Sequence, residues 1–196
     1  AYEVSACLVG SEMCIRDRFA FTPRAAGGRL ALDCDLTFLA QDPRWLSSAL
    51  KTSGSQTLAT AGSGWSGSLT NAGTALTYPI FTVTTGPTGN ALVNPEIFAY
   101  DGANYVQLGL LYTTVPNDIL VFDCDPRNRA NAVTLNGVVR LDLINTANGT
   151  FGTLNTVGNS AFFPYMKPGA VTMGVQSPTI TGTGNTGVIQ WRDAWL

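Results

Sequence analysis

The alternation of apolar and polar residues at positions 187–195 predicts a β-strand. The three large apolar side chains of this stretch, Ile189, Trp191 and Trp195, fall on the same face if the residues alternate between two faces. A period of two residues is typical of a strand with one buried face. Two tryptophans on that face predict that the strand docks into a sheet formed by earlier parts of the chain.

From about residue 77 onward, short apolar runs follow one another at the spacing typical of a β-sandwich or barrel. Turn signals separate the runs, and Asn136-Gly137 is the strongest hairpin signal among them. No window has a helical period. We therefore predict an all-β chain with an antiparallel β-sandwich over residues 76–196. Its expected strands are 77–85, 95–100, 105–111, 119–123, 132–135, 138–143, 161–165, 170–176 and 187–195.

Residues 30–39 also alternate, with an apolar set that includes Cys34 and a second set that is half charged. This pattern predicts a strand with one buried and one solvated face, and residues 19–21 are a candidate partner strand. Because a two-stranded ribbon is marginal alone, we interpret 19–50 as the remnant of a truncated N-terminal β-domain. Residues 51–75 are mostly Ser, Thr, Gly and Ala, and are expected to form a linker or surface arm.

The first residues, 1–18, are predicted not to be native protein. Residues 7–17 read as the translation of a transposase-type adapter used in shotgun sequencing libraries, and the residues before them fit the upstream primer. A signal peptide is the alternative. Such a peptide requires a basic region followed by a continuous apolar region, and here charged residues interrupt every apolar run. We therefore leave residues 1–18 out of the fold prediction and expect the native N-terminal sequence to be missing.

Composition narrows the function classes. The chain of 196 residues is 45% hydrophobic and only 12% charged, and its net charge is -2. No basic face is available to neutralise phosphates, which makes nucleic acid an unlikely partner. No apolar run approaches the roughly 20 residues that span a bilayer. Outside residues 1–18, the cysteines are Cys34 and Cys124, each expected to be a buried small apolar side chain.

The sequence offers little catalytic chemistry. It contains no histidine, the commonest general base and metal ligand. Asp123 and Asp125 have the spacing of a glycosidase carboxylate pair, but a strand end followed by an Asx turn is the favoured interpretation. Asp33 and Asp35 are expected on a solvated strand face, and the Asn-Gly-Thr triplet at 148–150 is a common chance match for glycosylation. We predict no catalytic, cofactor or metal site.

Aromatic residues are the remaining candidates for binding. Their flat faces suit the apolar faces of pyranose rings, although aromatic residues that alternate in a β-protein more often belong to a core or an interface. Arg192 is expected on the opposite face from both terminal tryptophans, as a surface or interface contact. The candidate interface or saccharide contacts are Trp65, Tyr105, Tyr112, Tyr165 and Arg192.

Five segments follow one another in a characteristic order over residues 36–196. They are LTFLAQDPRW at 36–45, YPIFTVT at 78–84 with Gly86-Pro87 and Asn94-Pro95, DILVFD at 118–123 with VTLNG at 133–137, Phe162-Phe163 with Pro168-Gly169, and WRDAW at 191–195. In this order the segments resemble the distal tail protein family of siphophages, which has a galectin-like C-terminal domain. The chain departs from the family pattern at Asn117, where Gly is frequent, and at Phe162, where Trp is frequent.

The resemblance implies a structural component of a phage tail, located in the virion and assembled in the bacterial host cytoplasm. It implies partners among the tube, tail-tip and tail-fibre proteins, a homo-hexamer for the full-length protein, and in some phages weak contact with host-surface saccharide. Residues 19–50 would be the last strands of the ring domain. The lack of a disulfide framework agrees with a cytoplasmic site of assembly.

Two other functions stay open. A carbohydrate-binding β-sandwich module of a secreted or virion protein predicts an exposed row of aromatic residues and measurable affinity for sugar. An enzyme is poorly supported, because the sequence shows no nucleophile-base constellation.

Overall fold

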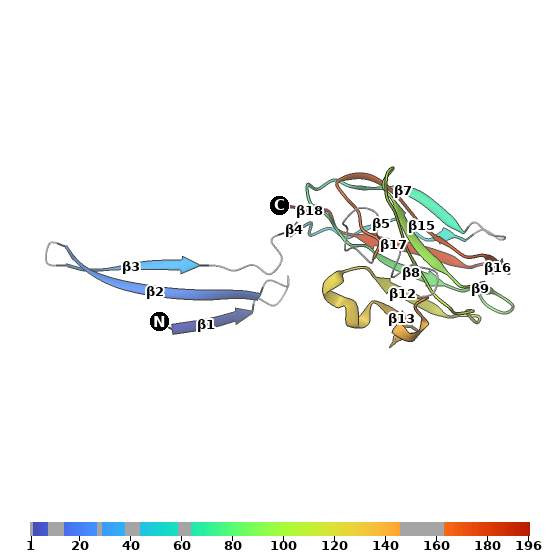
Figure 1. The fold of residues 1–196 in the computed structure, drawn as a ribbon, viewed down its shortest axis with the longest axis horizontal. Coiled ribbons are helices and arrows are strands. Elements are labelled where there is room, and N and C mark those ends of the chain that lie inside the picture. The colour runs from blue at the N-terminus through green and yellow to red at the C-terminus, as the bar shows by residue number, and fades with distance from the viewer. Residues whose placement is uncertain (1, 8–13, 27–28, 38–43, 59–63, 146–162) are drawn as a thin grey trace. The chain divides into compact units, whose positions relative to one another are not determined.

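A computed structural model of the chain describes residues 2–7, 14–26, 29–37, 44–58, 64–145 and 163–196 (Figure 1). The first three ranges are described only as strands. The chain divides into two compact units, Ala1–Arg44 and Trp45–Leu196.

The first unit is a three-stranded antiparallel sheet in the order β1-β2-β3. Its strands are β1 (Tyr2–Cys7), β2 (Cys14–Ala26) and β3 (Arg29–Thr37). The predicted strand over 30–39 and its partner at 19–21 are confirmed as far as Thr37, since Phe19 lies opposite Leu36. Strand β1 and the beginning of β2 fall in the segment predicted to be adapter-derived.

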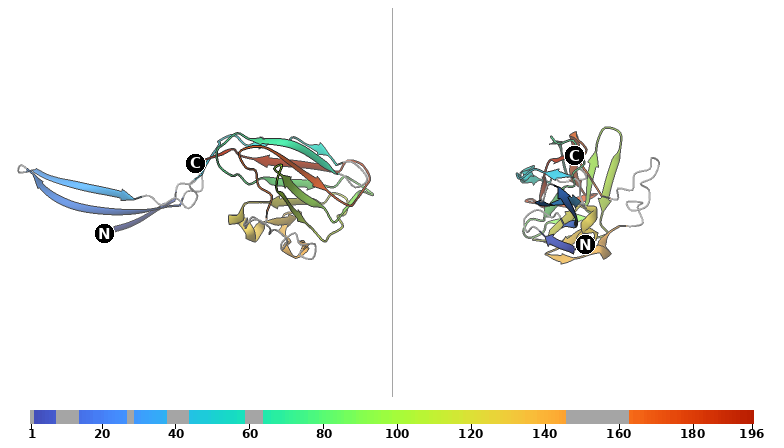
Figure 2. Two further views of the ribbon diagram at one scale, coloured as in Figure 1. Left: turned by 45° about the horizontal axis from the view of Figure 1, so that its top comes forward. Right: turned by 90° about the vertical axis from the view of Figure 1, so that its left-hand side faces the viewer.

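The second unit is an antiparallel β-sandwich, as predicted (Figures 1 and 2). One layer is a four-stranded sheet in the order β11-β10-β15-β7. The other is a larger sheet in the order β14-β13-β12-β8-β17-β5, with β6 also paired to β17. The strands of the first layer are β7 (Trp65–Asn71), β10 (Glu96–Tyr100), β11 (Tyr105–Gly109) and β15 (Gly169–Gln176).

The strands of the second layer, which we call the large sheet, are shorter at its margins. They are β5 (Lys51–Thr52), β6 (Gln56–Thr57), β8 (Ile80–Thr84), β12 (Ile119–Asp123), β13 (Val133–Leu135), β14 (Val138–Val139) and β17 (Thr186–Trp191). Two small ribbons complete the unit: β9 (Ala91–Val93) with β16 (Thr179–Thr181), and β4 (Trp45–Leu46) with β18 (Ala194–Trp195).

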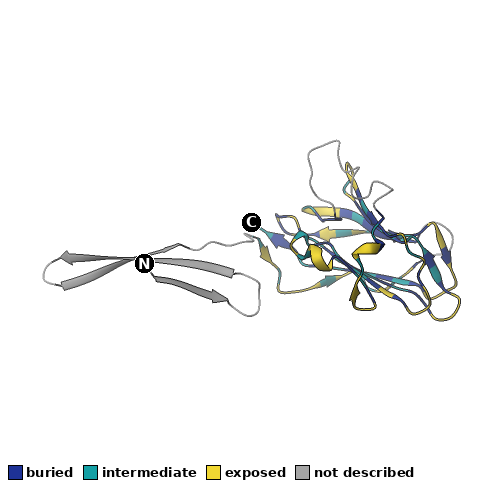
Figure 3. Cartoon of the chain, turned by 60° about the horizontal axis from the view of Figure 1, so that its bottom comes forward, coloured by how far each residue is buried: buried dark blue, intermediate teal, exposed yellow. Residues whose placement is uncertain are grey.

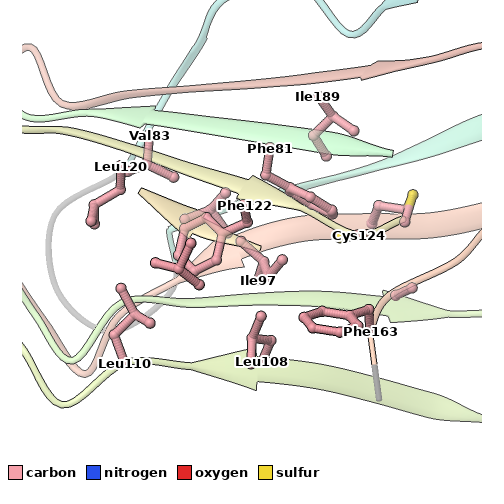
Figure 4. Packing of buried hydrophobic residues seen from close by; sticks show 14 of the residues in the cluster. Phe81, Val83, Ile97, Leu108, Leu110, Leu120, Phe122, Cys124, Phe163 and Ile189 are labelled. Carbon is pink, nitrogen blue, oxygen red and sulfur yellow. The ribbon is translucent and has the colours of Figure 1, made fainter. Parts of the chain in front are cut away.

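The core lies between the two layers because every second residue of each central strand is buried (Figure 3). Phe81, Phe122 and Ile189 of the large sheet face Ile97 and Leu108 of the four-stranded sheet, as Figure 4 shows. All five side chains are fully buried. This alternation of apolar core positions with more polar outward positions is what places the two outer faces described below.

The described helical residues form two short 3-10 helices, η1 (Pro126–Asn131) and η2 (Leu141–Leu143). Asp125 caps η1, where a turn was predicted. Within the described part of the chain, neither helix has the length or apolar character needed to cross a membrane.

The Asn136-Gly137 hairpin is confirmed. Both residues have positive φ, 51° and 79°, which a tight hairpin turn between β13 and β14 requires. The strand expected over 138–143 was too long, however. It ends at Val139, and η2 follows, because Leu143 turns inward to be buried.

Two further strand predictions need correction. Residues 163–165, the described part of the strand expected at 161–165, form no strand, and only Met166 makes a bridge, to Thr77. The strand expected over 187–195 ends at Trp191, because the Asp193 carboxylate is buried and accepts a hydrogen bond from the Ala72 backbone N–H, 3.0 Å. Trp191 does dock as predicted, with its indole N–H donating to the Thr70 carbonyl, 3.2 Å.

Residues 51–75, expected to form a linker or arm, contribute the three strands β5, β6 and β7 to the sandwich within their described part. Strands β5 and β6 pair with β17, and β7 pairs with β15 along its whole length. Leu58 and Ala75 are buried. The described part of this segment is therefore integral to the second unit.

Candidate interaction surfaces

The outer face of the large sheet is nearly free of charge. Outward positions on its central strands are partly buried and carry Thr, Val, Ile and Gln side chains; they are Ile80, Thr82, Thr84, Val121, Asp123, Thr134, Thr186, Val188 and Gln190. The register sets Val188, Thr82, Val121 and Thr134 side by side across four strands. Asp123 is the single ionisable residue of this row of positions.

The Asp123 carboxylate is occupied by local hydrogen bonds. It accepts from the Asp125 backbone N–H, 3.0 Å, and from the Asn128 side-chain amide, 2.6 Å. Asp125 in turn accepts from the Arg127 backbone N–H, 2.9 Å, and pairs with the Arg127 guanidinium. These contacts confirm the strand end followed by an Asx turn, and they give the two carboxylates structural partners.

The outer face of the four-stranded sheet is chemically different. Its register sets Tyr100 between Tyr105 and Thr172, and Phe98 between Gln107 and Gly174. Tyr100 and Tyr105 are among the exposed large side chains, at 43% and 48% exposure. We call this surface, formed by Glu96, Phe98, Tyr100, Tyr105, Thr172 and Gln176, the aromatic face.

The aromatic face is held by stacking and by a polar network. The Phe98 and Tyr105 rings are stacked, with centroids 5.4 Å apart and planes 20° from parallel. The Gln176 side-chain amide donates to Glu96 Oε2, 2.9 Å, and to the Tyr105 hydroxyl, 3.2 Å. Partial burial, and secondarily the Glu96 charge, raise the pKa of Tyr105 despite the opposing Gln176 bond, so its hydroxyl keeps its proton at neutral pH.

The structure does not bring the five sequence-predicted contact residues together. Trp65 lies opposite Val175, on the inner side of β7, where it packs against the core. The Tyr112 hydroxyl donates to the Asp118 carboxylate, 2.8 Å. Tyr165 is buried. Arg192 donates to the backbone carbonyls of Ser47 and Ser48 and so fastens the loop after β4. Tyr105 alone of the five is placed on the exposed aromatic face.

Sequence reasoning missed Glu96, Phe98, Tyr100 and Gln176. A signal was present, because Glu96, Phe98 and Tyr100 alternate with the apolar Ile97 and Ala99. That pattern predicts one face for the three residues. Only the register with β11 and β15, however, brings them next to Tyr105 and Gln176.

The remaining chemistry is structural within the described ranges. Cys124 is fully buried and makes no disulfide, as predicted for a small core residue, and burial raises the pKa of its thiol. No group of His, Cys, Asp or Glu side chains in the described part of the chain is arranged to hold a metal ion. The side chains of Cys34, Asp33 and Asp35, and the triplet at 148–150, lie outside what the structure describes.

The sequence matches no known protein-family profile and no curated protein. The fold, however, is similar to the crystal structure of the SPP1 Dit (gp 19.1) protein, with a TM-score of 0.55 and 16% identity. The similarity covers 94% of this chain and 61% of that one, so the chain spans about three fifths of the length of the protein that it resembles. That protein is described as a paradigm of the hub adsorption apparatus in phages that infect Gram-positive bacteria. The resemblance to distal tail proteins drawn from the sequence segments is thus confirmed at the level of the fold.

Proposed function

We propose that this chain is a structural component of a phage tail, of the distal tail type, that acts by binding neighbouring proteins and not by catalysis. The observation that carries the proposal is the fold similarity to a phage hub protein across 94% of the chain. The ordered segments of sequence that resemble the distal tail family support it independently. In this role the protein belongs to the virion tail and is assembled in the bacterial host cytoplasm.

The outer face of the large sheet is the surface best suited to such binding. Soluble antiparallel sheets usually present polar and charged side chains to water. Protein interfaces are depleted of charge at their centre, because each charge loses its hydration on burial. The row from Val188 through Thr82 and Val121 to Thr134 has this composition. We assign it to contact with an adjacent tail protein, for which tube, tail-tip and fibre proteins are the candidates.

The mass of the full-length protein in solution tests the proposal. The complete open reading frame is recovered by re-reading the gene, expressed and measured by light scattering. A homo-hexamer whose upstream sequence adds a second β-domain is the expected result. A monomer fused to a catalytic domain would overturn the proposal and favour a carbohydrate-binding module of a secreted protein.

A pair of lysine variants tests the surface. Val121→Lys places a charge at the centre of the proposed interface and is expected to weaken binding to tail proteins co-expressed from the same phage by at least about tenfold. Ser68→Lys adds the same charge to an exposed position on β7 of the other sheet and should leave binding unchanged. Equal effects of the two variants would remove the large sheet from the interface.

A further inference from the structure

Asn136 has a hydrogen-bonded side chain at an exposed position. It is the first residue of the turn between β13 and β14, and both Asn136 and Gly137 are exposed to solvent. The Asn136 side-chain oxygen accepts from the Ile119 backbone N–H, 2.8 Å, and its side-chain nitrogen donates to Asp118 Oδ1, 2.8 Å. Because one partner is a donor and the other a carboxylate, the two ends of the amide are unambiguous. Two hydrogen bonds thus tie this side chain to the beginning of β12.

The residue that follows is suited to react with this amide. A Cβ atom at position 137 would have no neighbour within 4 Å, so the space around the Gly137 peptide is open. Among the described residues, the Gly137 N–H has no hydrogen-bond partner. An unhindered, unpaired backbone nitrogen next to an asparagine side chain is the arrangement from which deamidation proceeds.

The reaction has two steps and needs only water. The Gly137 nitrogen attacks Asn136 Cγ, and its proton leaves with the side-chain NH2 group as ammonia, so that a five-membered succinimide forms. Water then adds to one of the two imide carbonyls and opens the ring, which gives aspartate or isoaspartate. Asparagine is one of the thermolabile residues of proteins for this reason.

The native hydrogen bonds oppose the first step. Both ends of the Asn136 amide are in use, so the side chain is free to turn toward the Gly137 nitrogen only after these bonds open. Ammonia, moreover, leaves only when the bond from the amide nitrogen to Asp118 breaks. We propose that Asn136 is a deamidation site whose reaction is controlled by its hydrogen bonds to Asp118 and Ile119.

The products keep this link open. Aspartate at position 136 has no proton to donate to Asp118 and places a second carboxylate beside the first, where the amide nitrogen now lies. Isoaspartate adds one carbon to the backbone of a two-residue turn and so disturbs the register that pairs Leu135 with Val138. Deamidation is therefore an irreversible record of local opening. The inference does not depend on the proposed tail function, because it uses contacts within the second unit alone.

Peptide mapping by mass spectrometry tests the inference, because exchange of NH2 for OH changes the mass of the peptide that contains Asn136. The full chain is incubated at neutral pH and one temperature, in buffer and in urea. Asn136 is expected to react at least about tenfold more slowly in buffer. Asn148-Gly149, the same dipeptide elsewhere in the chain, provides the reference rate in urea. Equal rates for Asn136 in buffer and in urea would overturn the inference.

Variants of Asp118 separate this local control from general stability. Asp118→Ala should raise the rate at Asn136 in buffer by about tenfold, because it removes the acceptor that holds the leaving group. Asp142→Ala, which removes an exposed carboxylate paired with Arg140, is the matched control and should leave the rate unchanged. Ile97→Val shortens a core side chain of the other sheet and should raise the rate far less. An unchanged rate in Asp118→Ala, or an equal increase in Ile97→Val, contradicts the proposed control.

Asp118→Asn, which keeps the size and one acceptor oxygen of the side chain, is used in these measurements if Asp118→Ala does not fold. The same substitution tests the effect of the product. Asn136→Asp is expected to lower the urea midpoint of unfolding, and the double variant Asn136→Asp with Asp118→Asn should recover most of that loss, since it restores one amide and one carboxylate. No loss in the single variant, or no recovery in the double variant, would show that the product does not repel Asp118.

Discussion

The two outer faces of the sandwich are built by the same alternation but differ in chemistry. On the large sheet, the outward row through Thr82 and Val121 consists of β-branched side chains that fit a pleated surface without specific partners. On the four-stranded sheet, outward positions combine Phe98 and Tyr105 with Gly174, whose backbone accepts a ring lying flat on it. The first face tolerates exchange among similar residues, whereas the second depends on particular residues at particular cross-strand positions.

The largest difference between the faces should appear when valine replaces one outward residue on each. Gly174→Val is expected to lower the free energy of unfolding by about 3 kcal/mol, because the new atoms meet the Trp65 backbone and the Phe98 ring. Thr82→Val, on the large sheet, should change it by less than about 1 kcal/mol. Urea denaturation followed by tryptophan fluorescence measures both. Equal stabilities for the Gly174→Val variant and the unchanged protein would show that the Phe98 ring does not lie over position 174.

Hydrogen bonds to Asp118 join the two layers. Its buried side chain directly precedes β12 of the large sheet. Its carboxylate accepts hydrogen bonds from the Tyr112 hydroxyl, the Val115 backbone N–H and the Asn136 amide, each 2.8 Å. Tyr112 follows β11 of the four-stranded sheet. Asp118→Ala leaves three donors without their acceptor, and is expected to cost about 2 kcal/mol in the free energy of unfolding.

The same link predicts a pH dependence. Burial tends to raise the pKa of Asp118, but the hydrogen bonds from Val115, Asn136 and Tyr112 outweigh it and the pKa is lowered. The stabilisation is therefore complete above the unfolded value of about 3.9 and is lost as pH falls through the lower folded value. The stability difference between the protein and Asp118→Ala should shrink on acidification. Asp142→Ala, which removes an exposed carboxylate paired with Arg140, is the control. Its stability difference from the unchanged protein should depend on pH less than that of Asp118→Ala.

Local patterns predicted the central part of the sandwich well. The alternation in 119–123 and 170–176 and the Asn136-Gly137 turn each encode their element within a few residues, and each is present. Strand β7 was missed because its outward residues Ser66, Ser68 and Thr70 resemble a linker. It is an edge strand whose order comes from pairing with β15, about a hundred residues later in the chain.

The candidate site was harder to predict for the same reason. Tyr105 could be chosen from its residue type alone, but Trp65 and Tyr165 were chosen on equal grounds and face the interior. Burial of a tyrosine or a tryptophan depends on which strand lies opposite, and a single sequence does not contain that register. The aromatic face exists only where β10 lies between β11 and β15.

A smaller effect should separate stacking from hydrogen bonding on the aromatic face. Tyr105→Ala removes the ring stacked on Phe98 and is expected to lower the free energy of unfolding by about 1 kcal/mol. Tyr105→Phe keeps the stack and loses only the hydrogen bond from Gln176, so its cost should be well below that. Thermal unfolding of the two variants provides the comparison. A larger loss for Tyr105→Phe than for Tyr105→Ala would mean that the polar network, and not the stack, orders this face.

The smallest effect is expected for Val121→Thr, and it tests the other half of the comparison. Both residues are β-branched, and Thr already occupies the neighbouring positions on β8 and β13, so the free energy of unfolding should change by less than about 0.5 kcal/mol. Chemical denaturation of the isolated chain measures the change. A loss above about 1.5 kcal/mol, the range seen when buried apolar groups are replaced, would mean that Val121 is covered within the chain itself. A covered Val121 could not meet a partner, so that result would remove this face as a binding surface and leave the aromatic face as the one open side of the sandwich.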